Sequence, residues 1–204
     1  MSSGTRTCNI CSCGQGKKES IKTPNYHNEE TEFLNQIVFN DSLLDSLLVY
    51  ENPEQINLSD LGLRTPGLDS GFQLLNEVSD AEMIQIIQQC TVNQFLKWTP
   101  GKLNGHKVFT SDQHMKIINQ EVDDNKYWDI FHVQYGKGCI NISKPIFFDN
   151  GQRAFFSFNA AWKGCGGKRE MNCYVKKNGK WYVDYGLKHS IICYFSTDNW
   201  NSRT

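Results

Sequence analysis

The chain has 204 residues, enough for one well-buried domain with a tail and too few for two typical domains joined by a linker. Its 21 basic and 22 acidic residues nearly cancel, so a formal net charge of -1 creates no field that would attract nucleic acid, and we expect no nucleic-acid partner. The sequence contains no run of about 20 apolar residues, so we also expect no transmembrane helix.

Residues 1–28 form a polar leader that is rich in Gly, Ser, Thr, Lys and Asn. Such a segment buries too little apolar surface to offset the entropy lost on ordering, so we expect it to be disordered. Cys8, Cys11 and Cys13 lie in it, but the second close pair of Cys or His residues that a zinc site needs does not follow. We therefore predict no metal and no other cofactor.

The leader has a second feature at its cysteines. The run from Ile10 to Cys13 resembles the end of a bacterial lipoprotein signal, and residues 14–20 are similar to the polar tether that follows such a signal. This resemblance implies that Cys13 is lipidated and that the chain contacts a membrane only through that anchor. Residues 1–8 lack the apolar stretch of about 7 to 15 residues typical of a secretory signal, so an unmodified terminus and a soluble cytoplasmic location stay open.

Between residues 29 and 50, apolar side chains recur at steps of three and four, which predicts one or two amphipathic helices with a break near Asn40. Residues 51–78 contain Pro53 and Pro66 together with three glycines, and this composition indicates a long irregular connection. Such a loop is either a lid or contact surface, or an ordered coil packed on the sheet.

Three further segments carry helix signals. Ser79 and Glu82 form a capping box, which predicts a helix over residues 80–90. Ser111 is the expected N-cap of the next helix, and residues 125–135 form another, ended by Gly136. The side chains expected to face the core are Met83, Ile84, Ile86 and Ile87 in the first helix, Met115, Ile117 and Ile118 in the second, and Tyr127, Trp128, Phe131 and Tyr135 in the third.

After Gly138 the apolar period changes from helical to two, which is typical of strands. Strands are expected over residues 140–146, 153–162, 169–177 and 180–185, with a fifth over 189–195. Turns at residues 149–151, 164–167 and 178–179 contain the Asn and Gly that tight hairpins require. The sequence predicts an α+β fold: N-terminal helices (29–136) packed on one face of a C-terminal antiparallel β-meander of four to five strands (139–196), in one domain over 29–204.

Several motifs within residues 95–185 agree in order and spacing with a known group. They resemble uncharacterised proteins of Bacteroidetes bacteria, many of which look like predicted lipoproteins. This resemblance implies a location in the bacterial cell envelope and supplies no activity. The group often has two cysteines beside the glycines of the loop after the second strand, where this chain has only Cys165. The motifs are Trp98, Val108 to Asp112, Tyr127 with Trp128, Phe131, Tyr135 with Gly136, Ser143 to Phe147, Ala154, Cys165 with Gly166, and Lys177 to Trp181.

The glycine-rich loop is the candidate ligand site. Backbone amides in such a loop can cradle an anion, and nearby cations would favour a negatively charged ligand. The site would consist of Lys163, Gly164, Cys165, Gly166 and Gly167.

The same loop suggests two roles for its cysteine. A thiol enzyme would use Cys165 as the nucleophile, with His132 or His189 as the base. Alternatively the loop is a tight turn whose cysteine is idle or bridges to Cys173, eight residues away across the expected hairpin.

The leading functional hypothesis is a non-enzymatic, envelope-anchored domain that binds an unknown protein or small molecule. It rests on the tether-like leader, the aromatic sheet and the lack of a recognisable catalytic motif. Two alternatives stay open. One is a small thiol-dependent enzyme or hydrolase that uses Cys165, and the other is an immunity-type protein that neutralises a partner protein.

Overall fold

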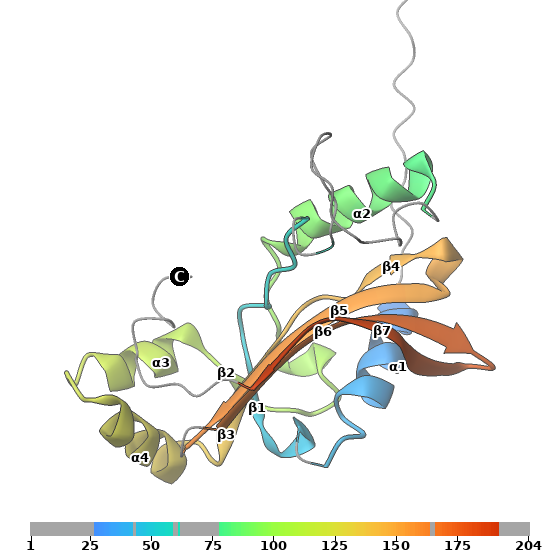
Figure 1. Cartoon of the computed structure of the whole chain (residues 1–204). Coiled ribbons are helices and arrows are strands. Elements are labelled where there is room, and N and C mark those ends of the chain that lie inside the picture. Colours follow the sequence, from blue (N-terminus) through green and yellow to red (C-terminus); the bar gives the residue numbers. More distant parts are fainter. Residues whose placement is uncertain (1–26, 43, 59–60, 62–77, 164–165, 192–204) are drawn as a thin grey trace, which may run out of the picture.

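The computed structural model describes residues 27–42, 44–58, 61, 78–163 and 166–191 (Figure 1). This part of the chain forms four α-helices and one seven-stranded sheet, with three short 3-10 turns. The helices are α1 (His27–Ile37), α2 (Asp80–Asn93), α3 (Ser111–Ile118) and α4 (Asp124–Gln134). The strands are β1 (Leu48–Tyr50), β2 (Val108–Phe109), β3 (Gly138–Ile142), β4 (Ile146–Phe148), β5 (Arg153–Trp162), β6 (Gly166–Lys177) and β7 (Lys180–Ile191).

The sheet is mixed, with the strand order β2-β1-β3-β5-β6-β7 and β4 beside β5. Strands β3 to β7 pair antiparallel, whereas β1 pairs parallel with both β2 and β3. The α+β class is therefore confirmed, but the purely antiparallel, purely C-terminal sheet is wrong. β1 and β2 lie within residues 29–136, the part of the chain predicted to be helical. β1 was missed there because an apolar run as short as residues 47–50 fits both the helical and the strand period.

The expected hairpins are present. Asn150 and Asn178 both have positive φ, near 51° and 52°, and Gly179 follows Asn178 with φ 74°. β6 begins at Gly166, three residues earlier than predicted. β7 continues to Ile191, so the strand predicted over residues 180–185 and the described part of the expected fifth strand form one strand. Two register shifts along β6 and β7 accommodate the length of this pair.

Both faces of the sheet are covered, not one as expected, with α1 and α2 on opposite sides (Figure 1). Phe156 of β5 packs with α1, and its neighbour Phe155 packs in the cluster that contains Ile86 of α2. This alternation follows from the period of two along a strand. On the α1 side, Phe33 is fully buried, with its ring centroid 5.0–6.0 Å from rings of four strands: Phe147, Phe156, Tyr174 and Trp181.

Helices α3 and α4 enclose a third cluster of buried side chains around Phe131. The N-cap of α3 is Thr110, not Ser111, because Thr110 forms a capping box with Gln113. α4 is confirmed, and Gly136 follows it with a positive φ of 133°, which favours glycine.

The rotation of α2 about its axis differs from the prediction. Its capping box is present, but Ile84 and Ile87 face solvent, while Ile86, Gln89 and Cys90 face the sheet. Gln89 takes the inward position because its side-chain amide completes the backbone of β4. Nε2 of Gln89 donates to the Phe147 carbonyl at 2.7 Å, and Oε1 accepts from the Phe147 N–H at 3.0 Å.

The Gln89 contact can be tested by substitution. Gln89→Ala leaves a buried N–H and a buried carbonyl of Phe147 without this partner, so we expect the free energy of unfolding to fall by about 2 to 4 kcal/mol. Urea denaturation of the full chain measures the change. Gln94→Ala, which removes an exposed glutamine at the end of the same helix, should change stability little. Equal effects of the two substitutions would contradict this role.

Candidate functional site on the outer side of helix α2

Five large apolar side chains are exposed on α2 and the turn that follows it. We call them the α2 surface: Ile84 (43% exposed), Ile87 (40%), Val92 (54%), Phe95 (82%) and Leu96 (40%). Single exposed apolar residues are common on proteins, but a group on one element indicates a site of interaction. The α2 surface is therefore the candidate functional site.

The N-terminal end of α2 is held firmly. The Glu82 carboxylate accepts hydrogen bonds from the backbone and hydroxyl of Ser79, at 2.9 and 2.7 Å, and from the Asp149 N–H at 3.1 Å. These hydrogen bonds, those from Ser79 above all, lower the pKa of Glu82. The carboxylate thus fixes the first turn of α2 to the β4–β5 hairpin.

The turn that carries Phe95 and Leu96 is held from its other end. Trp98 is buried, its backbone N–H donates to the Glu51 carbonyl at 2.7 Å, and its indole N–H donates to the Ile142 carbonyl at 3.0 Å. The turn itself is closed by a 3.1 Å backbone hydrogen bond from Phe95 to Val92. The exposed side chains of Phe95 and Leu96 therefore extend from a backbone with a defined position.

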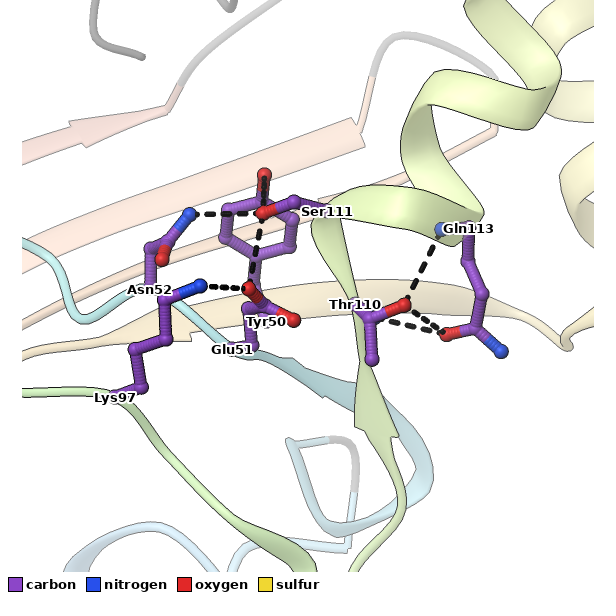
Figure 2. A network of polar contacts seen from close by, with 7 residues as sticks. All are labelled: Tyr50, Glu51, Asn52, Lys97, Thr110, Ser111 and Gln113. Carbon is purple, nitrogen blue, oxygen red and sulfur yellow. Dashed lines mark hydrogen bonds and ion pairs between the residues drawn. The ribbon is translucent and has the colours of Figure 1, made fainter.

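A polar network at the start of α3 braces this turn (Figure 2). Because Thr110 caps the helix, the Ser111 hydroxyl is available to other groups, and it donates to Glu51 Oε1 at 3.2 Å and accepts from Asn52 Nδ2 at 3.0 Å. Lys97, next to Leu96 in the chain, places its Nζ 2.6 Å from the same Glu51 oxygen. The network links β1, α3 and the turn after α2.

The network is better suited to bracing than to catalysis. Burial alone would raise the pKa of Glu51, but hydrogen bonds from Lys97 and Ser111 outweigh it and hold this pKa below its ordinary value. A carboxylate with a lowered pKa is a weak general base at neutral pH, so it would activate the Ser111 hydroxyl poorly.

The predicted anion loop lies partly outside the described residues, since Gly164 and Cys165 are not among them. Lys163 is exposed and forms an ion pair with Asp129 of α4. Gly166 lies under the indole of Trp162, and Gly167 is buried. These contacts account for Lys163 and Gly166 without a ligand, and an anion site here stays a prediction.

A disulfide between Cys165 and Cys173 stays a prediction, because Cys165 lies outside the described residues. Cys173 is a fully buried free thiol. Gly166 and Cys173 lie on the single strand β6, seven residues and roughly 23 Å apart. Across the pair with β5, Cys173 instead faces Phe155.

The cysteines in the described part of the chain are all buried. Cys90 is a buried member of the α2 core cluster, as expected, and burial raises its pKa to about 11. Burial likewise raises the pKa of Cys139 to about 12. Such thiols are poor nucleophiles. His132 is exposed on α4, and the side chain of His189 lies outside the described residues.

The chain matches no protein-family model, no curated protein and no solved structure. The resemblance to Bacteroidetes proteins therefore stays a prediction, as does lipidation of Cys13, which lies outside the described residues. None of the helices in the described ranges is long and apolar enough to cross a bilayer. Within the same ranges, no three His, Cys, Asp or Glu side chains gather as metal ligands would.

The α2 surface was not predicted, although the sequence carried a signal for it. Met83, Ile84, Ile86 and Ile87 spread around more of the helix than the stripe of roughly 100° that one sheet face covers. Some of these side chains had to point away from the core. Which ones do so depends on Gln89, whose partner Phe147 is far away in the chain.

The packing role of Gly166 can be tested directly. A Cβ at this position would lie 1.7 Å from Nε1 of Trp162, so Gly166→Ala must displace the indole or the strand. We expect a loss of about 1 to 3 kcal/mol in the free energy of unfolding. Gly101→Ala is the matched control, because nothing lies within 4 Å of its added Cβ. Tight binding of phosphate by the parent chain, lost in Gly166→Ala at unchanged stability, would contradict a packing role.

The brace at Glu51 makes a prediction about pH. Folding lowers the pKa of Glu51 from its ordinary value of 4.5. The ionised carboxylate therefore stabilises the fold fully at pH values above 4.5, and this contribution is lost as the pH falls through the lowered pKa. Glu51→Gln should therefore reduce the free energy of unfolding at about pH 7 and reduce it much less at about pH 3. Chemical denaturation at both pH values measures the difference. Glu121→Gln, at an exposed site, is the control, and a pH-independent effect at Glu51 would refute the assignment.

Proposed function

We propose that this chain is a non-enzymatic interaction domain that binds a partner protein through the α2 surface. The observation that carries the proposal is the exposure of five large apolar side chains on α2 and the turn that follows it, a segment that is fixed at both ends. Fully burying a single Ile or Phe side chain contributes about 1.5 to 3 kcal/mol, so even partial burial of this group could sustain an association.

The shape of the α2 surface favours a protein over a small molecule. Small ligands bind in concave sites that enclose most of their surface, whereas the outer side of a helix is convex. A partner with an apolar groove or a second helix could cover Ile84, Ile87 and Phe95 together. Recognition of a helix by its residues at steps of three and four is a common mode of protein association.

Two further parts of the functional hypothesis belong to this proposal. Anchoring to the bacterial envelope rests on the resemblance of residues 10–20 to a lipoprotein signal and tether. The immunity-type alternative would use the same surface, with a toxin as its partner. The thiol-enzyme alternative stays a prediction, because its nucleophile, Cys165, lies outside the described residues.

Site-specific photocrosslinking tests the proposal. The photoreactive residue p-benzoylphenylalanine replaces Ile87 or Phe95 in turn, and the chain is irradiated in the cells that produce it. We expect crosslinked adducts at both positions, because a partner covers them. The control position is Val133 on α4, which is 85% exposed and lies outside the α2 surface. Adducts that are as frequent at Val133 as at Ile87 and Phe95 would refute the proposal.

A further inference from the structure

Helices α3 and α4 lie beside each other at the β2 edge of the sheet, and a buried histidine joins them (Figure 1). His114 of α3 is 4% exposed, and its Nδ1 lies 2.8 Å from the hydroxyl oxygen of Tyr127 of α4. We propose that His114 makes the attachment of α3 and α4 to the sheet sensitive to pH. The neutral ring supports the attachment, and protonation in mildly acidic solution loosens both helices.

The ring of His114 lies among aromatic side chains from three other elements. Its centroid is 6.2 Å from those of Tyr50 on β1 and Phe109 on β2, and 5.6 Å from that of Tyr127 on α4. All three of these residues are buried. The surroundings are therefore apolar and suit a neutral imidazole better than an imidazolium.

The titratable groups in this cluster carry no charge that would compensate a proton on His114. Burial raises the pKa of Tyr127, and it raises the pKa of Cys139 on β3 to about 12, so both groups are neutral at physiological pH. The hydroxyl of Tyr50 is engaged with that of Ser111, 3.3 Å away. An imidazolium would thus have a neutral hydroxyl as its hydrogen-bond partner in place of a carboxylate.

The charged side chains on the surrounding elements lie outside the cluster. On β1, Glu51 is already paired with Lys97. The titratable side chains on α3 and α4 other than His114 and Tyr127 are exposed or half-buried: Asp112, Lys116, Asp123, Asp124, Lys126, Asp129, His132 and Tyr135. Among the described residues, burial alone shifts the pKa of His114, and it lowers that pKa below its ordinary value of 6.5.

The aromatic rings do not make up for burial of the charge. A cation over an aromatic face gains about 0.5 to 2 kcal/mol. Moving an ion from water into a protein interior costs several kcal/mol. The second quantity is larger, so the packed cluster disfavours the imidazolium and acid favours a state in which the ring reaches water.

The lowered pKa of His114 fixes the direction of the pH effect. At pH values above 6.5 the ring is neutral in both the packed and the released state, so pH changes nothing. Below 6.5 the released ring takes up a proton that the packed ring does not. Each pH unit then favours release by up to about tenfold, until the lowered pKa of the packed ring is reached.

The effect should be local because α3 and α4 have a core of their own. Their buried side chains, including Ile117 and Phe131, form one cluster with β1, β2 and β3, whereas α1 and α2 pack in two others. Release of α3 would also remove the Ser111 contact with Glu51 that is drawn in Figure 2. His114 lies on a different helix from the α2 surface, so its pH response does not depend on the proposed function.

Hydrogen exchange of the full chain, measured by mass spectrometry, tests the proposal. Between about pH 7.5 and about pH 5, peptides of α3 and α4 should lose protection by roughly ten- to thirtyfold, after correction for the pH dependence of the intrinsic exchange rate. Peptides of α1 and β5 should keep their protection over the same range.

Two matched substitutions separate His114 from other acid effects. His114→Asn removes the titrating ring and keeps a polar group close to the position of Nδ1, so the difference between the two pH values should disappear in α3 and α4. His132→Asn removes an exposed histidine of α4 and should leave the response of the parent chain unchanged. The readout is the change with pH, so a uniform loss of stability in His114→Asn does not affect it.

An NMR titration of the imidazole signals of the parent chain tests the same proposal without any substitution. The signal of His114 should titrate with a midpoint below 6.5. Three outcomes would overturn the proposal. They are a midpoint at or above 6.5, an acid-induced loss of protection that persists in His114→Asn, and a loss in α1 and β5 equal to that in α3 and α4, which would show global unfolding.

Discussion

The pair of hydrogen bonds between the Gln89 side chain and the Phe147 backbone decides which side of α2 meets the sheet. β4 pairs with β5 along one edge only, and Phe147 has a buried N–H and carbonyl to satisfy on the other. Turning the helix to bury Ile87 would remove both bonds. Each buried polar group left without a partner costs about 1 to 3 kcal/mol, which is comparable to the free energy gained by burying one isoleucine. The two hydrogen bonds of Gln89 therefore fix the rotation of α2 about its axis, and Ile84 and Ile87 remain exposed.

A second set of contacts ties the other end of the α2 surface to the rest of the fold. Lys144 is buried, with its Nζ 3.2 Å from the ring centre of Trp98 and 2.6 Å from the Glu30 carboxylate of α1. Burial lowers the pKa of Lys144, and the neighbouring Glu30 opposes that shift. Trp98 in turn positions the turn that carries Phe95. The ion pair therefore connects α1, on one side of the sheet, with the surface presented by α2 on the other.

The features that the sequence predicted correctly depend on residues close together in the chain. The Ser79 and Glu82 capping box and the turn at Asn178 are set by contacts within three residues, so their physics is visible in the sequence. β1 was missed for the opposite reason: it becomes a strand by pairing with β3, about ninety positions away, as in the match of Val49 with Ile140. Its three residues carry too little periodicity to distinguish helix from strand.

The candidate site shows the same limit. The glycines near Cys165 suggested a cradle for a ligand, and nothing in the sequence could show that the indole of Trp162 occupies the space above Gly166. Conversely, Ile84 and Ile87 looked like core residues, because their spacing suits a helix packed on a sheet. A pattern specifies how many apolar side chains a helix has, and long-range hydrogen bonds such as that of Gln89 specify where they point.

Rigidity is what distinguishes the α2 surface from apolar residues exposed by chance. Binding pays for ordering the groups that make contact, and a helix capped at its first turn and braced after its last turn is ordered beforehand. The apolar middle supplies attraction without direction, because hydrophobic burial depends on area. The contacts that hold α2 in the fold therefore also give its outer side the fixed shape that a specific association requires.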